Sequence, residues 1–394
     1  MGIKVLSLFD GMACGMIAFK QLGVEIDEYH AYEIDKYAVQ TSSHNFPEII
    51  HHGDVFEGDF KEYKGFDYLV GGSPCTFWSI AQSKDKRETT ASGIGWELFS
   101  QYVRALHEAR PKYFLYENNK SMSKDIYKSI SDTFGFEPIC INSALVSAQN
   151  RQRLYWVGKR NPDGTYSKVD IGQPEDRGIL LRDVLDGMTD RKKGRAVIGS
   201  TGRTTDREYF KKSQGNMAFE PIGTIREDDK ANCITTVQKD SMVCQQVGAL
   251  PRPNGELSTS QAFRIYSSDA KGVTLKAGGG GAGGKTRLYA IPVEFENGIP
   301  TKAISYADGK TYRVYRVKNG LITIKDKEYP IKLIDGYYII RKLTVSECKR
   351  LQTVPEWFDF PVSDTQAYKC LGNGWTVDVI VHLLTATLKE KETI

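Results

Sequence analysis

Three short segments of the chain carry side chains that can act together on an unsaturated ring. Residues 71–75 (GGSPC) present a cysteine after a turn, residues 116–119 (YENN) present a carboxyl group, and residues 149–153 (QNRQR) present two arginines two positions apart. By strand spacing the two arginines share a face. Taken singly, each segment has a simpler interpretation: a buried thiol in a turn, a capping acid and a basic strand end.

Methylation of carbon 5 of cytosine is a reaction that needs all three groups. Carbon 5 is a poor nucleophile, and it becomes a good one when a thiolate adds to carbon 6 and turns the ring into an enamine. A carboxyl group beside ring nitrogen 3 and an arginine beside the carbonyl oxygen support that addition. Because a free thiol has a pKa of about 8.5, we expect the site to favour the thiolate, with help from the arginines.

Alternating strand and helix patterns bring these segments to one edge of a sheet. Short apolar runs predict strands at 4–9, 29–33, 66–70, 113–116 and 154–157, and helical patterns separate the first of them. This alternation predicts an α/β fold with a doubly wound, mostly parallel sheet, whose ligands bind at the carboxyl ends of the strands. Four polar residues follow or occupy those ends, namely Asp10, Glu33, Cys75 and Glu117.

The ends of the first strands offer places for a methyl donor. Residues 9–15 (FDGMACG) form a glycine-bearing turn without the GxGxxG spacing of dinucleotide enzymes, which weakens a hydride-transfer hypothesis. Glu33 ends the second strand, where an acid can bind the two ribose hydroxyls. Asp54 can lie near an adenine amino group. Taken alone, each feature is more typical of a loop glycine or a solvated acid.

The middle of the 394-residue chain differs in composition from its ends. The net charge is +4, but residues 191–332 hold 25 Lys and Arg against 14 Asp and Glu, a balance of +11 that leaves −7 elsewhere. From about residue 183, helical patterns give way to short β-branched runs, including hairpin patterns at 321–324 and 329–332. We predict a first domain over 1–182, a β- and loop-rich domain over 183–340, and a segment, 341–394, that rejoins the first. The basic excess fits a polyanion-binding surface or a solvated lysine-rich one.

Composition also argues against several classes of protein. No apolar run approaches the roughly 18 to 20 residues that span a bilayer, and the first residues do not resemble a signal peptide. The 7 cysteines are scattered without a CxxC pair, which argues against zinc and for a reducing compartment. We therefore expect a cytoplasmic protein without a metal and without a membrane partner.

In order along the chain, the segments resemble the motifs of the DNA cytosine-5 methyltransferase family. The matching segments are 9–15 for the first motif, 73–75 (SPC) for the Pro-Cys motif, 117–119 for Glu-Asn-Val, 149–153 for Gln-x-Arg-x-Arg, 341–358 for the ninth motif and 372–374 (GNG) for the tenth. The family keeps its target recognition domain between the Gln-x-Arg-x-Arg motif and the ninth motif. In this chain that interval is the basic region, so the resemblance implies a Rossmann-like methyltransferase sheet with a smaller target recognition domain at 183–340.

The resemblance implies a role for each matched residue. Cys75 is the expected covalent nucleophile, Glu117 the acid at ring nitrogen 3, and Arg153 the group at the carbonyl oxygen, with Arg151 as a second candidate. The implied methyl donor is S-adenosylmethionine, released as S-adenosylhomocysteine. Its expected border is Phe9, Asp10, Gly11, Met12, Gly15, Glu33, Ile34, Asp54, Val55, Pro74, Asn373 and Trp375. The implied partner is duplex DNA with the cytosine flipped out of the stack.

Some residues depart from the family pattern. Asn119 replaces the usual valine, Thr76 replaces glutamine or asparagine, and 374–377 (GWTV) is similar to the animal de novo enzymes. The basic middle region is more similar to bacterial and phage members. We favour a bacterial or phage origin, in which a cognate restriction endonuclease is a natural partner, and we expect a monomer.

Three alternatives stay open at this point. A transfer-RNA branch of the same family has a small recognition region, whereas the basic region here is roughly 150 residues long and favours duplex DNA. A catalytically dead DNA-binding regulator is expected to lose Cys75, Glu117 or the arginines, and all are present. A small-molecule cytosine enzyme has no use for the basic region.

Overall fold

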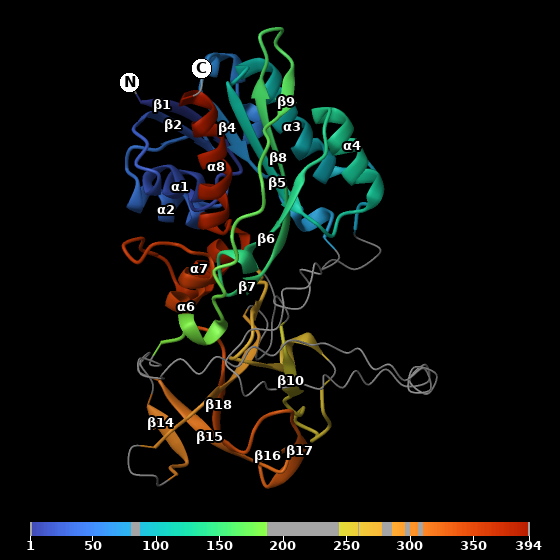
Figure 1. The fold of residues 1–394 in the computed structure, drawn as a ribbon, viewed down its shortest axis with the longest axis vertical. Helices are drawn as coiled ribbons and strands as arrows, with labels where there is room; N and C mark the ends of the chain where they lie inside the picture. The colour runs from blue at the N-terminus through green and yellow to red at the C-terminus, as the bar shows by residue number, and fades with distance from the viewer. Residues whose placement is uncertain are drawn as a thin grey trace.

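The structure is a computed structural model that describes residues 2–79, 87–186, 244–258, 260–277, 286–295, 300–305 and 310–392. Two large sheets follow one another along the chain, the first in the upper part of Figure 1 and the second in the lower part. Within the described ranges, no helix combines the length and the apolar character needed to cross a membrane.

The first sheet has eight strands in the order β3-β2-β1-β4-β5-β8-β6, with β9 paired to β8. They are β1 (Ile3–Leu8), β2 (Ile26–Tyr32), β3 (Ile50–His51), β4 (Tyr68–Gly71), β5 (Tyr113–Asn119), β6 (Ile139–Asn142), β8 (Gln152–Arg160) and β9 (Tyr166–Lys168). The pairings among β1 to β5 are parallel, and β8 pairs antiparallel with β5, β6 and β9. The predicted mostly parallel sheet is confirmed.

Helices cover both faces of this sheet, as alternation along β1 requires. Val5 packs in one core cluster, while Leu6 and Leu8 point to the other. The first cluster includes residues of α1 (Cys14–Gln21), α2 (Lys36–Asn45) and α8 (Val377–Glu392), and the second includes residues of α3 (Ile94–Ala109) and α4 (Lys124–Phe134). The C-terminal helix α8 lies against α1, so the end of the chain rejoins the first sheet (Figure 1).

The structure also contains elements that the local pattern does not predict. These are α4, β3, β6, β9 and α7 (Asp364–Asn373). The predicted strand 113–116 continues to Asn119, because Glu117 and its two followers pair with β8. Glu117 therefore lies within a strand and not after it.

The second sheet is held by its own apolar cluster. Its strands run in the order β10-β11-β13-β18-β15-β16-β17, with β14 paired to β15. They are β10 (Gln246–Ala249), β11 (Arg264–Ser267), β13 (Leu288–Pro292), β14 (Ala303–Ser305), β15 (Thr311–Lys318), β16 (Leu321–Ile324), β17 (Lys327–Pro330) and β18 (Gly336–Arg341). The predicted hairpin at 321–332 is confirmed as β16 and β17. The boundaries at 183 and 341 stay predictions.

The segment that follows β11 packs back onto the QNRQR segment of the first sheet. β12 (Gly272–Val273) pairs in parallel with β7 (Gln149–Asn150). The buried ammonium of Lys271 donates to three backbone carbonyls, those of Ala144 at 2.6 Å, Ser147 at 3.2 Å and Ile179 at 2.6 Å. An ammonium has three N–H donors, so this arrangement uses all of them.

A second junction joins β18 to α6 (Val345–Leu351), the helix that begins the return of the chain. Arg341 donates to Glu347 through both terminal nitrogens, at 2.6 and 2.7 Å, and both side chains are almost fully buried. Glu347 also accepts from the backbone N–H of Thr344 in a capping box. The Lys271 contacts and the Arg341–Glu347 pair thus hold the segment after β11 and the end of β18 against the region around the candidate site.

Candidate active site

Cys75 lies just after β4, at the start of a 3-10 helix, Cys75–Phe77. The turn before it is attached to the neighbouring strand β5. The hydroxyl groups of Ser73 and Tyr116 lie 2.7 Å apart, and the Asn118 amide donates to the Ser73 carbonyl at 3.2 Å. All three of these side chains are buried, so their hydrogen bonds place the cysteine beside the carboxyl end of β5.

Gly72 allows the turn and β5 to approach each other closely. A Cβ atom at this position would lie 2.7 Å from the carbonyl oxygen of Glu117 and 3.0 Å from its Oε2. A contact of 2.7 Å with backbone cannot be relieved by a side-chain rotation. The glycine in GGSPC is therefore a steric requirement for bringing Cys75 and Glu117 together.

The carboxyl group of Glu117 has a different partner on each oxygen. Arg153 Nε forms an ion pair with Oε1 at 2.9 Å, and the indole Nε1 of Trp375 donates to Oε2 at 3.1 Å. The side chains of Glu117 and Arg153 are only 12% and 15% exposed. The local pattern predicted Glu117 and Arg153 for one site, but the contact with Trp375, 258 positions away, had no local signal.

Arg151 has other partners than Arg153. Its guanidinium is buried and donates to the carbonyl of Gly372 at 3.3 Å and to that of Gly374 at 2.9 Å. Burial, followed by the nearby charge of Arg153, lowers the pKa of Arg151 to about 10. The structure thus attaches this arginine to the turn before Trp375.

The thiol of Cys75 experiences both burial and charge. Burial raises its pKa, the charge of Arg153 opposes that rise, and the charge of Glu117 adds to it. The expectation that the site favours the thiolate is wrong for this structure, because desolvation outweighs the two arginines. Burial thus opposes ionisation of Cys75, and the charge of Arg153 favours it.

The turn after β1 holds its backbone in an uncommon conformation. Phe9 has φ 58° and Gly11 has φ 60°. Glu33 Oε2 accepts from the Gly11 N–H at 2.9 Å, which fixes the turn against the end of β2. Asp10 Oδ1 accepts from Ser7 and from Tyr29, whereas the buried Oδ2 of Asp10 has no hydrogen-bond partner. Burial raises the pKa of Asp10 to about 6.

A cleft of about 740 Å³ is lined mainly by the residues that follow Glu33 in the chain, 34–37, and by residues of α7. Ile34 and Asn373 line it, and the Ile34 side chain, 76% exposed, offers an apolar surface for a flat ring. Asp10 and Glu33 do not line the cleft, although Glu33 directly precedes Ile34 in the chain. The Ile34 surface fits the flat base of S-adenosylmethionine, and the buried Oδ2 of Asp10, at the end of β1, is an unpartnered acceptor that suits its cationic end.

The match to known families agrees with this geometry. The family model described as C-5 cytosine-specific DNA methylase matches residues 3–389. The chain belongs to this family. It is accordingly a DNA cytosine-5 methyltransferase. As a member of this family, it uses S-adenosylmethionine as its methyl donor.

Phage and bacterial proteins are among the relatives of this methylase. The orphan methyltransferase M.SPRI of Bacillus phage SPR is 25% identical over 96% of this chain and 95% of its own length. The type II methyltransferase M1.ScrFI of Lactococcus lactis subsp. cremoris is 25% identical over 98% of this chain and 78% of its own length. These relatives agree with the expected bacterial or phage type.

Solved structures support the fold of the methylase. A putative DNA modification methyltransferase encoded within an E. coli prophage has a TM-score of 0.53 at 17% identity, covering 98% of this chain and 99% of its own. The Entamoeba histolytica methyltransferase EhMeth has a TM-score of 0.57 at 13% identity, covering 99% of each chain. Both similarities extend over both sheets.

The remaining predicted donor-binding residues of the methylase lie around the same edge. Asp54 caps a short 3-10 helix through the N–H of Phe56 at 3.0 Å, and Val55 is buried beneath it. Met12 and Gly15 lie under the turn that ends at Trp375, since a Cβ at Gly374 would meet Met12 at 3.3 Å. Pro74 directly precedes the nucleophile candidate.

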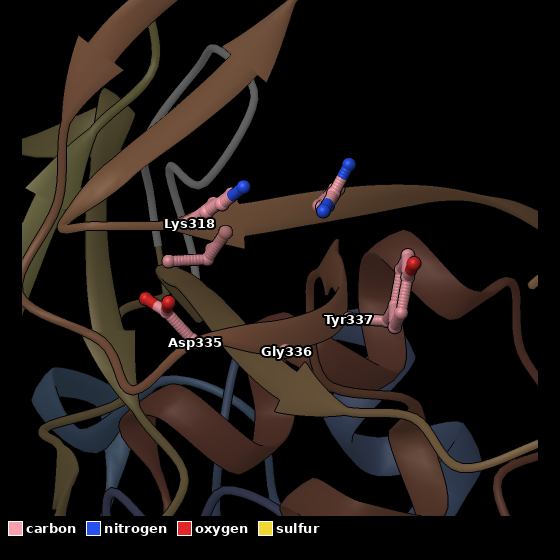
Figure 2. A pocket seen from close by; sticks show the side chains of 6 residues that line it. Lys318, Asp335, Gly336 and Tyr337 are labelled. Atoms are coloured by element: carbon pink, nitrogen blue, oxygen red, sulfur yellow. The ribbon is translucent and has the colours of Figure 1, made fainter.

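A second, smaller cavity of about 190 Å³ lies between β15 and β18 of the second sheet (Figure 2). Its lining includes Arg316, Lys318, Asp335 and Tyr337, and none of the predicted site residues. Among the described residues, no group of His, Cys, Asp and Glu is placed to hold a metal ion. The predicted catalytic residues therefore lie apart from this cavity.

Proposed function

We propose that this methylase modifies carbon 5 of a flipped-out cytosine in a specific duplex DNA sequence, with Cys75 as the covalent nucleophile. One observation carries the proposal. Arg153 forms its ion pair with Glu117 at 2.9 Å, and the charges of both act on the Cys75 thiol. A thiol, a carboxyl group and a guanidinium are the groups that addition to carbon 6 requires.

In the proposed reaction, the Cys75 thiol loses its proton to water and its sulfur adds to carbon 6. Glu117 donates a hydrogen bond or a proton to ring nitrogen 3, and Arg153 stabilises charge on the carbonyl oxygen. The enamine that results makes carbon 5 a nucleophile, and carbon 5 takes the methyl group. Loss of the carbon 5 proton to water and of the Cys75 sulfur then restores the ring, and nitrogen 3 returns its proton. Arg151 supports this arrangement through its hydrogen bonds to the Gly372 and Gly374 carbonyls.

S-adenosylmethionine, when bound, supplies the methyl group from a sulfonium centre. We propose that the cleft beside Ile34 holds it, with the Glu33 carboxyl at the ribose and Asp10 at the cationic end. The unpartnered Oδ2 of Asp10 supports this placement. The other residues proposed for its border are Phe9, Gly11, Met12, Gly15, Asp54, Val55, Pro74, Asn373 and Trp375.

Duplex DNA is the proposed partner of the second sheet and the basic region. The balance of +11 over residues 191–332 supports phosphate binding, and base flipping follows because carbon 6 is inaccessible inside the stack. We propose 183–340 as the target recognition domain and 341–394 as a return to the first domain. The type II name of one bacterial relative supports a restriction endonuclease as a partner for a monomeric methylase.

The test uses tritiated S-adenosylmethionine with mixed duplex DNA and RNA substrates. We expect label in 5-methylcytosine of the DNA, and we expect Cys75→Ser to abolish it. Cys140→Ser is the matched control, because Cys140 lies in β6 at a similar partly buried position and has no proposed role. Label confined to RNA would refute the DNA substrate, and label that survives Cys75→Ser would refute the covalent mechanism.

A further inference from the structure

The indole of Trp375 touches both halves of the proposed site. Its Nε1 donates to Glu117 Oε2 at 3.1 Å. At its other side, a Cβ atom placed on Gly15 would lie 3.9 Å from the ring atom Cζ3 of Trp375. Gly15 lies in the first turn of α1 and is one of the residues proposed to border the methyl donor, and Glu117 is the group proposed for the cytosine ring. One side chain therefore spans the distance between the two.

The backbone around Trp375 is held from several directions. The Gly374 carbonyl accepts from Arg151 at 2.9 Å and from the Gln352 amide at 3.0 Å. The carbonyl of Trp375 itself accepts from the Cys14 thiol at 3.7 Å. Because the carbonyls on both sides of the Trp375 Cα atom are hydrogen-bonded, the backbone that carries the indole has a defined position.

The two donors on Glu117 determine how its carboxyl group is turned. Arg153 occupies one site on Oε1 and Trp375 occupies one on Oε2. A carboxylate has about four lone-pair sites, so each oxygen keeps one at which it can bind the proton that Glu117 donates to ring nitrogen 3. With one donor on each oxygen, rotation of the carboxyl plane is restricted while a direction of approach for ring nitrogen 3 stays open.

We propose that Trp375 is a positioning residue for Glu117, which acts through its indole N–H on the orientation of the carboxyl group. The inference rests on the proposed function, in which Glu117 acts at ring nitrogen 3. Trp375 was proposed above to border the methyl donor, and the inference gives it a second role beside the cytosine ring.

The decisive variant removes the N–H and keeps the ring. The full-length protein is made with β-(3-benzothienyl)alanine at position 375, where sulfur replaces the indole N–H, and Trp375→Phe is made as a second variant. Single-turnover transfer from tritiated S-adenosylmethionine to duplex DNA gives the rate, and calorimetry gives the donor Kd. We expect the rate to fall about 10- to 100-fold, the loss expected for one hydrogen bond to a charged group, with less than about a 3-fold change in Kd.

A double-mutant cycle separates positioning from structure. In a Glu117→Gln background, where the carboxylate is absent, the change at 375 should lower the residual rate by less than about 3-fold. The same benzothienyl replacement at Trp357, a ring that is 45% exposed and packs on Phe46, should leave the rate unchanged.

Two outcomes would overturn the inference. One is an unchanged rate with a weakened donor Kd, and the other is a full multiplicative loss in the Glu117→Gln background. Failure of the proposed function is recognised separately, because the wild-type protein would then show no label in 5-methylcytosine.

Discussion

The guanidinium of Arg151 donates to the carbonyl oxygen of Gly374 at 2.9 Å, across 223 positions of the chain. This bond joins the QNRQR segment to the turn that leads to Trp375. The same guanidinium also binds the Gly372 carbonyl, so two of its nitrogens serve one turn. The first arginine of QNRQR thus binds the turn that is proposed to border the donor, while Arg153 contacts Glu117.

Arg151→Lys should therefore weaken donor binding more than the chemical step. A lysine ammonium cannot reproduce the two guanidinium nitrogens that reach both carbonyls, so the turn at 372–374 is held less firmly in place. We expect the Kd for S-adenosylmethionine to rise about 10-fold or more, measured by calorimetry. Arg160→Lys, at the exposed end of β8, is the control. Normal donor binding with slow transfer would instead assign Arg151 to the cytosine carbonyl.

Gly72→Ala should separate the nucleophile from the acid. The added methyl group would lie 2.7 Å from the Glu117 carbonyl oxygen, so the turn that carries Cys75 has to move away from β5. We expect methyl transfer to fall about 100-fold, because a displacement of about 1 Å at reacting groups has that effect. Gly172→Ala is the matched control, since a Cβ there meets nothing within 4 Å. Full activity of Gly72→Ala would contradict the close approach.

Alkylation of Cys75 should report the balance between burial and charge. Burial raises the thiol pKa and Arg153 opposes the rise, so alkylation should accelerate at a higher pH than for an ordinary cysteine. Arg153→Gln removes a charge that favours the thiolate and should move the profile to still higher pH. The measurement is the rate of iodoacetamide labelling at Cys75, followed by mass spectrometry across pH. A profile that Arg153→Gln shifts to lower pH would contradict this account.

Local sequence pattern predicts the strands of the first sheet and the residues at their ends. Apolar runs bounded by Gly, Pro or Asp indicate β1, β4 and β5, and the cysteine and acid that follow or end them come to one edge. Pattern does not give the antiparallel strand β8 as the neighbour of β5, because its pairing with β5 is decided by tertiary contacts. That pairing is what extends β5 through Glu117.

The contacts that complete the site are long-range and leave no local signal. Arg151 and Arg153 look equivalent in sequence, yet one binds the Gly374 carbonyl and the other binds Glu117. The sequence-based expectation that Cys75 favours the thiolate was wrong, because nearby arginines in the sequence do not reveal how deeply the thiol is buried. Lys271 also looks like one of many surface lysines in a basic region, and only the fold shows that it is buried.

Donor affinity should depend on the protonation of Asp10. Burial raises its pKa from 3.8 to about 6, so between these values the folded protein keeps a proton that the unfolded chain releases. The free energy of unfolding should therefore fall as pH rises through this range. A cationic donor favours the carboxylate, so calorimetric affinity for S-adenosylmethionine should rise from about pH 5 to about pH 7. Asp10→Asn should flatten the rise, while Asp163→Asn, in an exposed turn, should not. An unchanged pH dependence in Asp10→Asn would refute this role.

Lys271→Met should weaken the packing of the segment after β11, which includes β12, against the QNRQR segment. The substitution keeps the length of the side chain but leaves the carbonyls of Ala144, Ser147 and Ile179 without their buried donor. We expect the free energy of unfolding to fall by about 3 kcal/mol, measured by urea denaturation, since unsatisfied buried acceptors carry a cost of that order. Lys168→Met, at an exposed position in β9, is the control.

The same substitution should affect catalysis indirectly. Ala144 and Ser147 precede Arg151 in the chain, and β12 pairs with β7 just before it. Loss of the Lys271 contacts should therefore slow methyl transfer under conditions where the variant is still folded, as shown by its unaltered circular dichroism. If Lys271→Met were as stable and as active as Lys168→Met, the three short contacts of the ammonium would contribute nothing to the site.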